Sequence, residues 1–123
     1  MYKIRLDEDW SFFVGKALSQ LCIGSYDVQL HFNDGVSISI YGEDPEKSFN
    51  HKTTRSSSSE VLGMPGGAVT LVSLLGATVQ MAASENDATL TISFDNEEEL
   101  RIYDSNDFYE SFTINGPNGL IVV

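Results

Sequence analysis

Residues 28–41 read VQLHFNDGVSISIY, and the rest of the chain is best interpreted outward from this stretch. Apolar and polar side chains alternate on both sides of Asn33-Asp34-Gly35, which is typical of two strands that share one buried face. Gly35 supplies the positive φ that a three-residue hairpin turn needs. The stretch therefore predicts an antiparallel β-hairpin.

The same pattern returns 62 positions later, where residues 90–103 read LTISFDNEEELRIY. Upstream of the two hairpins, residues 15–20 (GKALSQ) correspond to residues 76–81 (GATVQM) at a spacing of 61. Residues 15–23 taken alone fit a helix as well as a strand, and the correspondence favours the strand. The sequence thus predicts an internal repeat, 15–41 and 76–103, in which each copy is a three-stranded meander.

The remaining segments complete a single domain of 123 residues. We expect a strand at residues 2–6, short helical turns near Trp10–Val14 and within residues 65–75, and a C-terminal hairpin from strands at 108–114 and 120–123. Residues 43–60, which include a run of four serines, have the composition of a mobile surface loop. The predicted fold is mainly β (α+β at most), with two pseudo-repeated antiparallel β-meanders, short helical turns and a C-terminal hairpin.

Charge is the strongest compositional signal, because the net charge is −11 and its distribution is uneven. The second half of the chain, residues 62–123, has nine acidic residues, all between Glu85 and Glu110, and one basic residue, Arg101. Such a surface repels nucleic acids and anionic lipids and favours basic partners. Acidity that serves only solubility is the alternative interpretation.

Motifs for catalysis, metals and cofactors are missing from the sequence. His31, His51 and Cys22 have no partner at a zinc-ligand spacing, and the glycines of residues 63–67 lack the lysine of a phosphate-binding loop. The single cysteine excludes an internal disulfide. We therefore expect no catalytic residue, no metal and no cofactor.

Two segments bear on location. Residues 61–84 carry no charge, but glycines, Pro65 and polar residues interrupt them, so we expect no membrane span. The N-terminal residues 1–9 lack the apolar core of a signal peptide. We expect a cytoplasmic protein.

The second hairpin departs from the first at its turn. Glu97 stands where the first copy has Gly35, and Glu98 stands where it has the inward-facing Val36. Glutamate tolerates neither a positive φ nor burial well. Either the second turn is longer and rearranged, which we favour, or Glu98 points into a groove or a partner.

The chain resembles a family of small uncharacterised bacterial β-rich domains over residues 13–123. The stretches that carry the resemblance are Phe32-Asn33-Asp34-Gly35, Leu75-Gly76-Ala77-Thr78-Val79, Phe94 with Leu100-Arg101-Ile102, Tyr109-Glu110-Ser111 and Ile121-Val122-Val123. The resemblance implies no catalytic residues. In size, acidity and build the chain is also similar to the immunity proteins that bacteria keep beside secreted toxins.

Three functions follow as hypotheses. The first is a non-enzymatic protein-binding domain, such as an immunity protein that neutralises a basic toxin domain. The second is a structural module that forms a homodimer through its apolar C-terminal strand, and the third is an enzyme that uses grouped carboxylates. The candidate partner-binding residues of the first hypothesis are Asp95, Glu97, Glu98, Glu99, Asp104, Asp107 and Glu110.

Overall fold

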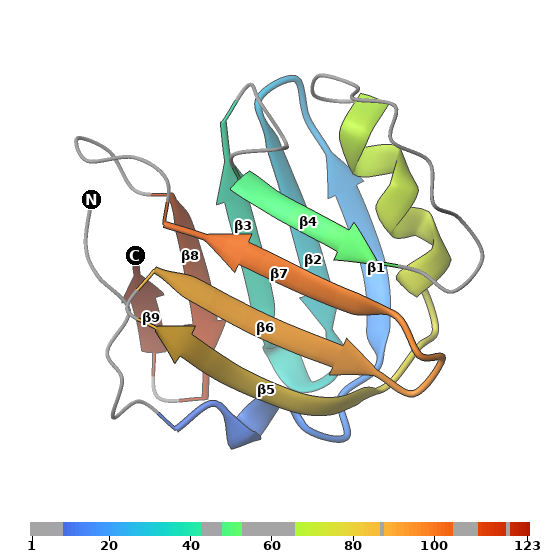
Figure 1. Cartoon of the computed structure of the whole chain (residues 1–123), viewed down its shortest axis with the longest axis vertical. Coiled ribbons are helices and arrows are strands. Elements are labelled where there is room, and N and C mark those ends of the chain that lie inside the picture. The colour runs from blue at the N-terminus through green and yellow to red at the C-terminus, as the bar shows by residue number, and fades with distance from the viewer. Residues whose placement is uncertain (1–8, 43–47, 53–65, 87, 105–110, 118) are drawn as a thin grey trace.

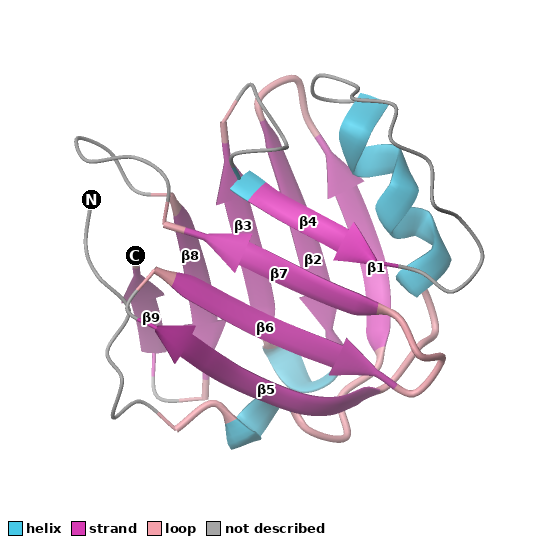
Figure 2. Ribbon diagram, viewed as in Figure 1, coloured by secondary structure: helices cyan, strands magenta, loops and turns pink. Residues whose placement is uncertain are grey.

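The computed structural model describes residues 9–42, 48–52, 66–86, 88–104, 111–117 and 119–123, and it confirms a mainly β protein. Two antiparallel sheets lie face to face (Figure 1). The strand order of the first sheet is β1 (Leu18–Ile23), β2 (Asp27–Phe32), β3 (Ser37–Tyr41), β8 (Phe112–Gly116) and β9 (Gly119–Val122). The order of the second is β4 (Phe49–Lys52), β7 (Glu99–Tyr103), β6 (Thr89–Phe94) and β5 (Val79–Asn86). The 3₁₀-helices lie between the strands along the chain: η1 (Ser11–Phe13) precedes β1, η2 (Asn33–Gly35) lies between β2 and β3, and η3 (Gly66–Leu74) precedes β5 (Figure 2).

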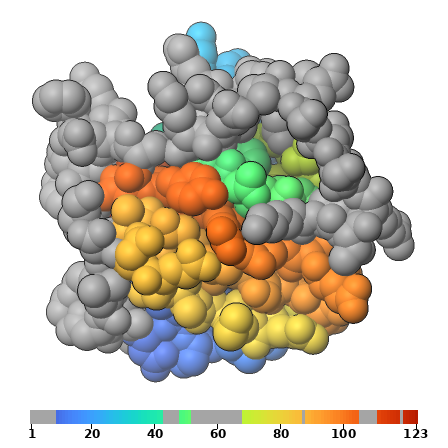
Figure 3. Space-filling view, viewed as in Figure 1, coloured from blue at the N-terminus to red at the C-terminus, as the bar shows by residue number. Residues whose placement is uncertain are grey.

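The core lies between the sheets and is built from the apolar positions of the alternating strands. In the first sheet Leu30 and Ile38 are fully buried, and in the second sheet Ile92 and Leu100 are fully buried. Burial of a side chain of this size stabilises the fold by about 1.5–3 kcal/mol. The intervening positions face outward, and Figure 3 shows this outer face for the second sheet. The predicted hairpins at 28–41 and 90–103 are confirmed as β2–β3 and β6–β7.

The two halves of the chain have matching backbone geometry at the point where they cross. Gly15 and Gly76 both have a φ of 85°. Gly15 N donates a hydrogen bond to Val79 O (2.9 Å), and in the corresponding bond Gly76 N donates to Leu18 O (2.8 Å). The bridge between Ala17 and Thr78 lies at the centre of this exchange. The two meanders, β1–β3 and β5–β7, are therefore related by a pseudo-twofold arrangement.

Each meander gains a fourth strand at the same edge. In the first sheet β8 pairs with β3, with Ile38 opposite Ile114 and Ile40 opposite Phe112. In the second sheet β4 pairs with β7, with Leu100 opposite His51 and Ile102 opposite Phe49. Phe49 thus corresponds to Phe112, and His51 corresponds to Ile114.

The helix η3 has three distinct sides because a 3₁₀-helix has three residues per turn. Ala68, Leu71 and Leu74 form the buried side and are fully buried. Val69, Val72 and Leu75 form an exposed apolar side. Thr70 and Ser73 form the third side, which faces the second hairpin.

Several predicted elements differ from the structure. The loop predicted at 43–60 contains the strand β4, in which Phe49 is buried against the core. The first strand of the second meander, β5, begins at Val79 rather than at Gly76, because residues 76–78 form the crossing with the first meander. The strand predicted at 2–6 lies outside the described residues. Of the described helices, none is long and apolar enough to cross a membrane.

Candidate functional site: a buried polar cluster beneath the β6–β7 turn

The second turn keeps the length of the first. Phe32 N donates to Val36 O (2.7 Å) across η2, and Phe94 N donates to Glu98 O (2.9 Å) across residues 95–97. The turns differ in backbone conformation, because Asp34 and Gly35 have φ values of 62° and 77° in the first, whereas Glu97 has a φ of 68° in the second. The favoured prediction of a longer turn is wrong, and Glu98 points inward.

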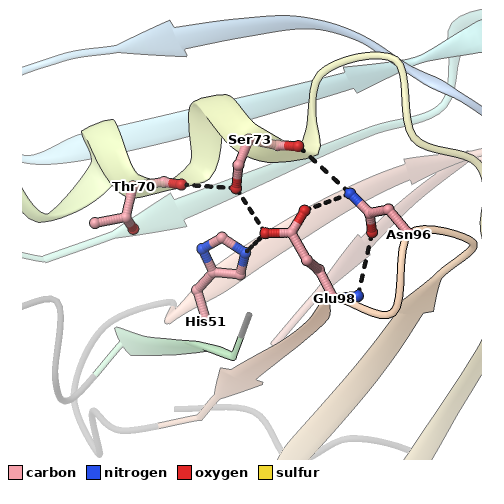
Figure 4. A network of polar contacts seen from close by, with 5 residues as sticks. All are labelled: His51, Thr70, Ser73, Asn96 and Glu98. Carbon is pink, nitrogen blue, oxygen red and sulfur yellow. Dashed lines mark hydrogen bonds and ion pairs between the residues drawn. The ribbon is translucent and has the colours of Figure 1, made fainter. Parts of the chain in front are cut away.

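Polar groups from two elements hold the buried carboxylate of Glu98, whose side chain is 9% exposed. Ser73 of η3 donates its hydroxyl hydrogen to Glu98 Oε1 (2.8 Å). Asn96 donates its amide hydrogen to Glu98 Oε2, and Asn96 Oδ1 accepts a hydrogen bond from Glu98 N (3.1 Å). Figure 4 shows His51, Ser73 and Asn96 converging on the carboxylate.

His51 reaches the same carboxylate from the edge strand β4. Its side chain is 3% exposed, and its Nε2 lies 3.2 Å from Glu98 Oε1. Neither ring nitrogen has a well-formed hydrogen bond within the described residues, and Nδ1 has no partner there. Burial lowers the pKa of His51 below its ordinary value, although the neighbouring Glu98 acts in the opposite direction. At neutral pH His51 is therefore uncharged.

The cluster joins three elements that are far apart in the sequence. The single hydroxyl hydrogen of Ser73 is shared between Glu98 Oε1 and the carbonyl oxygen of Thr70 (3.2 Å). Asn96 donates to the carbonyl oxygen of Ser73 (3.5 Å). The carboxylate of Glu98 therefore ties η3, the β6–β7 turn and β4 together. Ser73 itself is exposed, so one side of the cluster lies at the surface.

The repeat provides an internal reference for this cluster. Glu98 occupies the position of Val36, and His51 occupies the position of Ile114. Ser73 occupies the position of Phe12, because Lys16 N bonds Phe13 O and Ala77 N bonds Leu74 O in the same way, both at 3.0 Å. Burial of polar and ionisable groups costs stability relative to apolar groups of similar volume. The first half shows that this architecture forms with apolar residues at all three positions.

The chemistry of the cluster differs from that of a catalytic triad. In a triad the serine hydroxyl bonds to the histidine, which then accepts its proton. Here Ser73 donates to Glu98, and His51 approaches the same oxygen from another side. The arrangement supports proton binding by His51 and positioning of the turn, and it does not activate Ser73 as a nucleophile.

The predicted acidic residues do not form one patch. Asp95 and Glu97 are exposed on the β6–β7 turn. Asp95 is fixed there, since its backbone N donates to Thr78 O (2.8 Å) and its Oδ1 accepts from Thr78 N (3.1 Å). Asp104 follows β7 at the opposite end of the strand and accepts a hydrogen bond from the Ser111 hydroxyl (2.8 Å). Asp107 and Glu110 lie outside the described residues.

The two remaining candidates, Glu99 and Glu98, contact other residues of the chain. Glu99 Oε1 accepts a hydrogen bond from Arg101 Nε (2.7 Å), and Glu85 lies 3.6 Å from the same guanidinium. The structure places Glu98 inside the cluster and away from the surface. Of the seven candidates, the turn brings together Asp95, Glu97 and the buried Glu98.

Sequence reasoning did not find His51, Ser73 or Asn96. The signal in the sequence is Glu98 at the position of Val36. It does not identify His51, because β4 lies outside the repeated segment and its register is set by pairing with β7. Nor does it identify Ser73, which reaches Glu98 from η3, or Asn96, whose amide is one of several polar groups in the turn. Within the described residues no group of three or more His, Cys, Asp and Glu side chains is placed to hold a metal.

A separate surface groove of about 330 Å³ lies near the C-terminal hairpin. Its lining residues are Asp9, Ser11, Phe12, Gly116, Pro117, Gly119, Leu120 and Ile121. Among these described residues Asp9 is the one with a carboxylate, and hydrogen bonds from Ser11 lower the pKa of that group. The groove does not include the residues of the polar cluster.

Comparison of the chain with protein-family models, curated proteins and solved structures found no significant match. The family resemblance inferred from the sequence therefore stays a prediction.

Proposed function

We propose that this chain is a non-enzymatic binding domain whose β6–β7 turn engages a basic protein partner. An immunity protein that covers a basic toxin domain in the cytoplasm is the form of this function that best fits the size and charge of the chain. Opposite charge accelerates the encounter of two proteins and helps to select the partner.

The conformation of Glu97 carries the proposal. A non-glycine residue with a positive φ costs about 1–2 kcal/mol relative to glycine, and the first repeat has Gly35 at the corresponding position. Aspartate adopts a positive φ more readily than glutamate does, so Asp34 of the first turn is the less strained of the two residues. A strained and exposed glutamate at the tip of a turn is typical of a functional contact. No described cation pairs with Glu97 or Asp95.

The rigidity of the turn supports the same function. Thr78 holds Asp95 from one side, and Asn96 is held by Glu98 and by the carbonyl of Ser73. A contact surface that is already ordered loses little conformational entropy on binding. The carboxylate of Asp95 and the backbone at Glu97 are therefore held in a defined geometry.

A matched pair of charge reversals tests the proposal. Glu97→Lys should abolish capture of a basic protein that is released from the wild-type chain by raised salt. Asp34→Lys changes the charge equally at an exposed residue of the first turn, whose φ of 62° is close to the 68° of Glu97, and should leave capture intact. Equal capture by both variants would exclude the β6–β7 turn as the binding site.

Self-association is a second candidate, because Leu120 is 66% exposed on the edge strand β9. The terminal Val123 is 1% exposed and bonds to Ser111 and Phe112, so it is not free to pair with another copy. Leu120→Ser therefore tests this function better than a truncation. A dimer in analytical ultracentrifugation that persists at high salt and is lost in Leu120→Ser would support the second candidate over the first.

A further inference from the structure

We infer that His51 and Glu98 form a pH-sensitive latch that holds the edge strand β4 and the β6–β7 turn in place at neutral pH and releases them at mildly acidic pH. The effect on a partner rests on the proposed function of the turn, whereas the latch itself does not.

The inference starts from the contrast between the two repeats. At the corresponding positions the first half has Val36 and Ile114, which are 3% and 0% exposed and cannot change charge. In the second half these positions hold two ionisable side chains, 3.2 Å apart and both at least nine-tenths buried. The apolar pair cannot respond to pH at these two positions, whereas the ionisable pair can.

Protonation of His51 would disturb the cluster in its closed state, in which β4 is paired with β7. There the two N–H donors of the charged ring would face a single described acceptor. The charged imidazole donates from both nitrogens. Glu98 Oε1 faces Nε2, but Nδ1 has no acceptor among the described residues. A buried cation with an unsatisfied donor favours any state in which β4 moves away and His51 reaches water.

Glu98 is the charged group that faces His51 within the described residues. On β7 the residue opposite His51 is Leu100, while Glu99 and Arg101 bond each other on the outer face. The helix η3 contains no charged residue, and on β4 itself Lys52 pairs in register with Glu99. In the turn, Asp95 and Glu97 are exposed, and Asp95 Oδ1 accepts a hydrogen bond from Thr78 N.

The direction and size of the effect follow from linkage. Because burial lowers the pKa of His51 in the closed state, protons bind preferentially to the open state, and opening increases as the pH falls below about 6.5. The equilibrium between closed and open forms shifts by up to about tenfold per pH unit, until the pKa of the closed state is passed. The β6–β7 turn loosens together with β4, because Glu98 also holds Asn96.

Hydrogen–deuterium exchange of the whole chain, without any partner, tests the latch. After correction for intrinsic exchange, protection of residues 48–52 and 94–98 should fall by up to about tenfold between pH 6.5 and 5.5, while β2 keeps its protection. His51→Gln and the double variant His51→Ile/Glu98→Val should lose this pH dependence. His31→Gln, which removes the other histidine of the chain, should retain it.

Protection that is independent of pH in the wild type, or that has the same pH dependence in the His51 variants, would overturn the latch. The proposed function fails separately, if Glu97→Lys binds a basic partner as the wild type does at pH 7.5. If both inferences hold, partner binding by the wild type should weaken below pH 6.5, and binding by the double variant should not.

Discussion

The sharpest prediction concerns the unfolding free energy when His51 and Glu98 are replaced by isoleucine and valine, the residues at the corresponding positions of the first half. Glu98→Val alone leaves His51 buried without its facing acceptor and removes the acceptor of Ser73 and Asn96. Stranding buried polar groups in this way costs about 1–3 kcal/mol of unfolding free energy. Glu98→Val should therefore destabilise the protein, although valine is the more apolar residue.

The double variant His51→Ile/Glu98→Val should reverse this loss. Replacement of a buried ionic pair by apolar residues of similar volume is neutral or stabilising by about 1–4 kcal/mol. Val36 and Ile114 already pack at the corresponding positions of the same architecture, and Ser73 can turn to water because it is exposed. The double variant should thus exceed Glu98→Val in stability, with a coupling energy between the two sites of about 0.5–3 kcal/mol.

Urea denaturation at pH 7.5 measures these differences, with fluorescence of Trp10 as the signal. Trp10 is the single tryptophan of the chain and is 4% exposed, so its emission reports loss of the core. The slope of the free energy with urea should stay constant, since the surface exposed on unfolding hardly changes. Additive effects of the two single substitutions would refute the reasoning, because uncoupled residues do not act as a pair.

The wild type and the double variant His51→Ile/Glu98→Val should also differ in how their stability depends on pH. His51 has its ordinary pKa of about 6.5 when unfolded and a lowered pKa when folded. The contribution of neutral His51 to the unfolding free energy is present above about pH 6.5. It is lost as the pH falls below about 6.5, by at most about 1.4 kcal/mol per pH unit. The double variant should lack this slope between pH 7.5 and 5.5. Identical slopes in the two proteins would show that His51 does not cause it.

Three further substitutions test the local structure. Glu97→Gly, which imports Gly35 of the first turn, should raise the unfolding free energy by up to about 1–2 kcal/mol by relieving the positive φ, and a decrease would contradict the assigned strain. Gly76→Ala should cost about 1–2 kcal/mol, because φ is 85° there while nothing lies within 4 Å of an added Cβ, so an unchanged urea midpoint would argue against this backbone. Leu71→Ala should cost about 2–5 kcal/mol, whereas Val72→Ala on the exposed side of η3 should stay within about 0.5 kcal/mol, and similar losses would exclude the three-residue period.

The hairpins and the repeat could be predicted because their information is local. Alternation around Asn33-Asp34-Gly35 fixes which side chains face the core, and the return of the pattern 62 residues later fixes the second meander. The strand β4 could not be predicted in the same way. Its four residues, Phe49–Lys52, lie in a polar segment and form a strand through pairing with β7. Tertiary pairing therefore decides this element and, with it, the position of His51.

The candidate site, too, could be predicted only as far as local sequence information reaches. The anomaly at Glu98 was visible as a departure from the first repeat, but the preference for a rearranged turn relied on the rule that glutamate avoids burial. That rule holds for a carboxylate without partners. Here the bonds from Ser73 and Asn96 compensate the lost hydration. Asn96 is a local partner from the same turn, whereas Ser73 comes into reach only when η3 packs against the turn.

The duplicated architecture separates what folding requires from what it does not. Both meanders cross through the same exchange of hydrogen bonds at Gly15 and Gly76, so they share the constraints that set the fold. The first half meets those constraints with apolar residues at the three positions where the second half has Glu98, His51 and Ser73. Burial of an ionisable pair is no better for stability than a well-packed apolar pair, so stability alone does not account for the polar set. This is why we propose that the cluster serves the turn that carries Asp95 and Glu97.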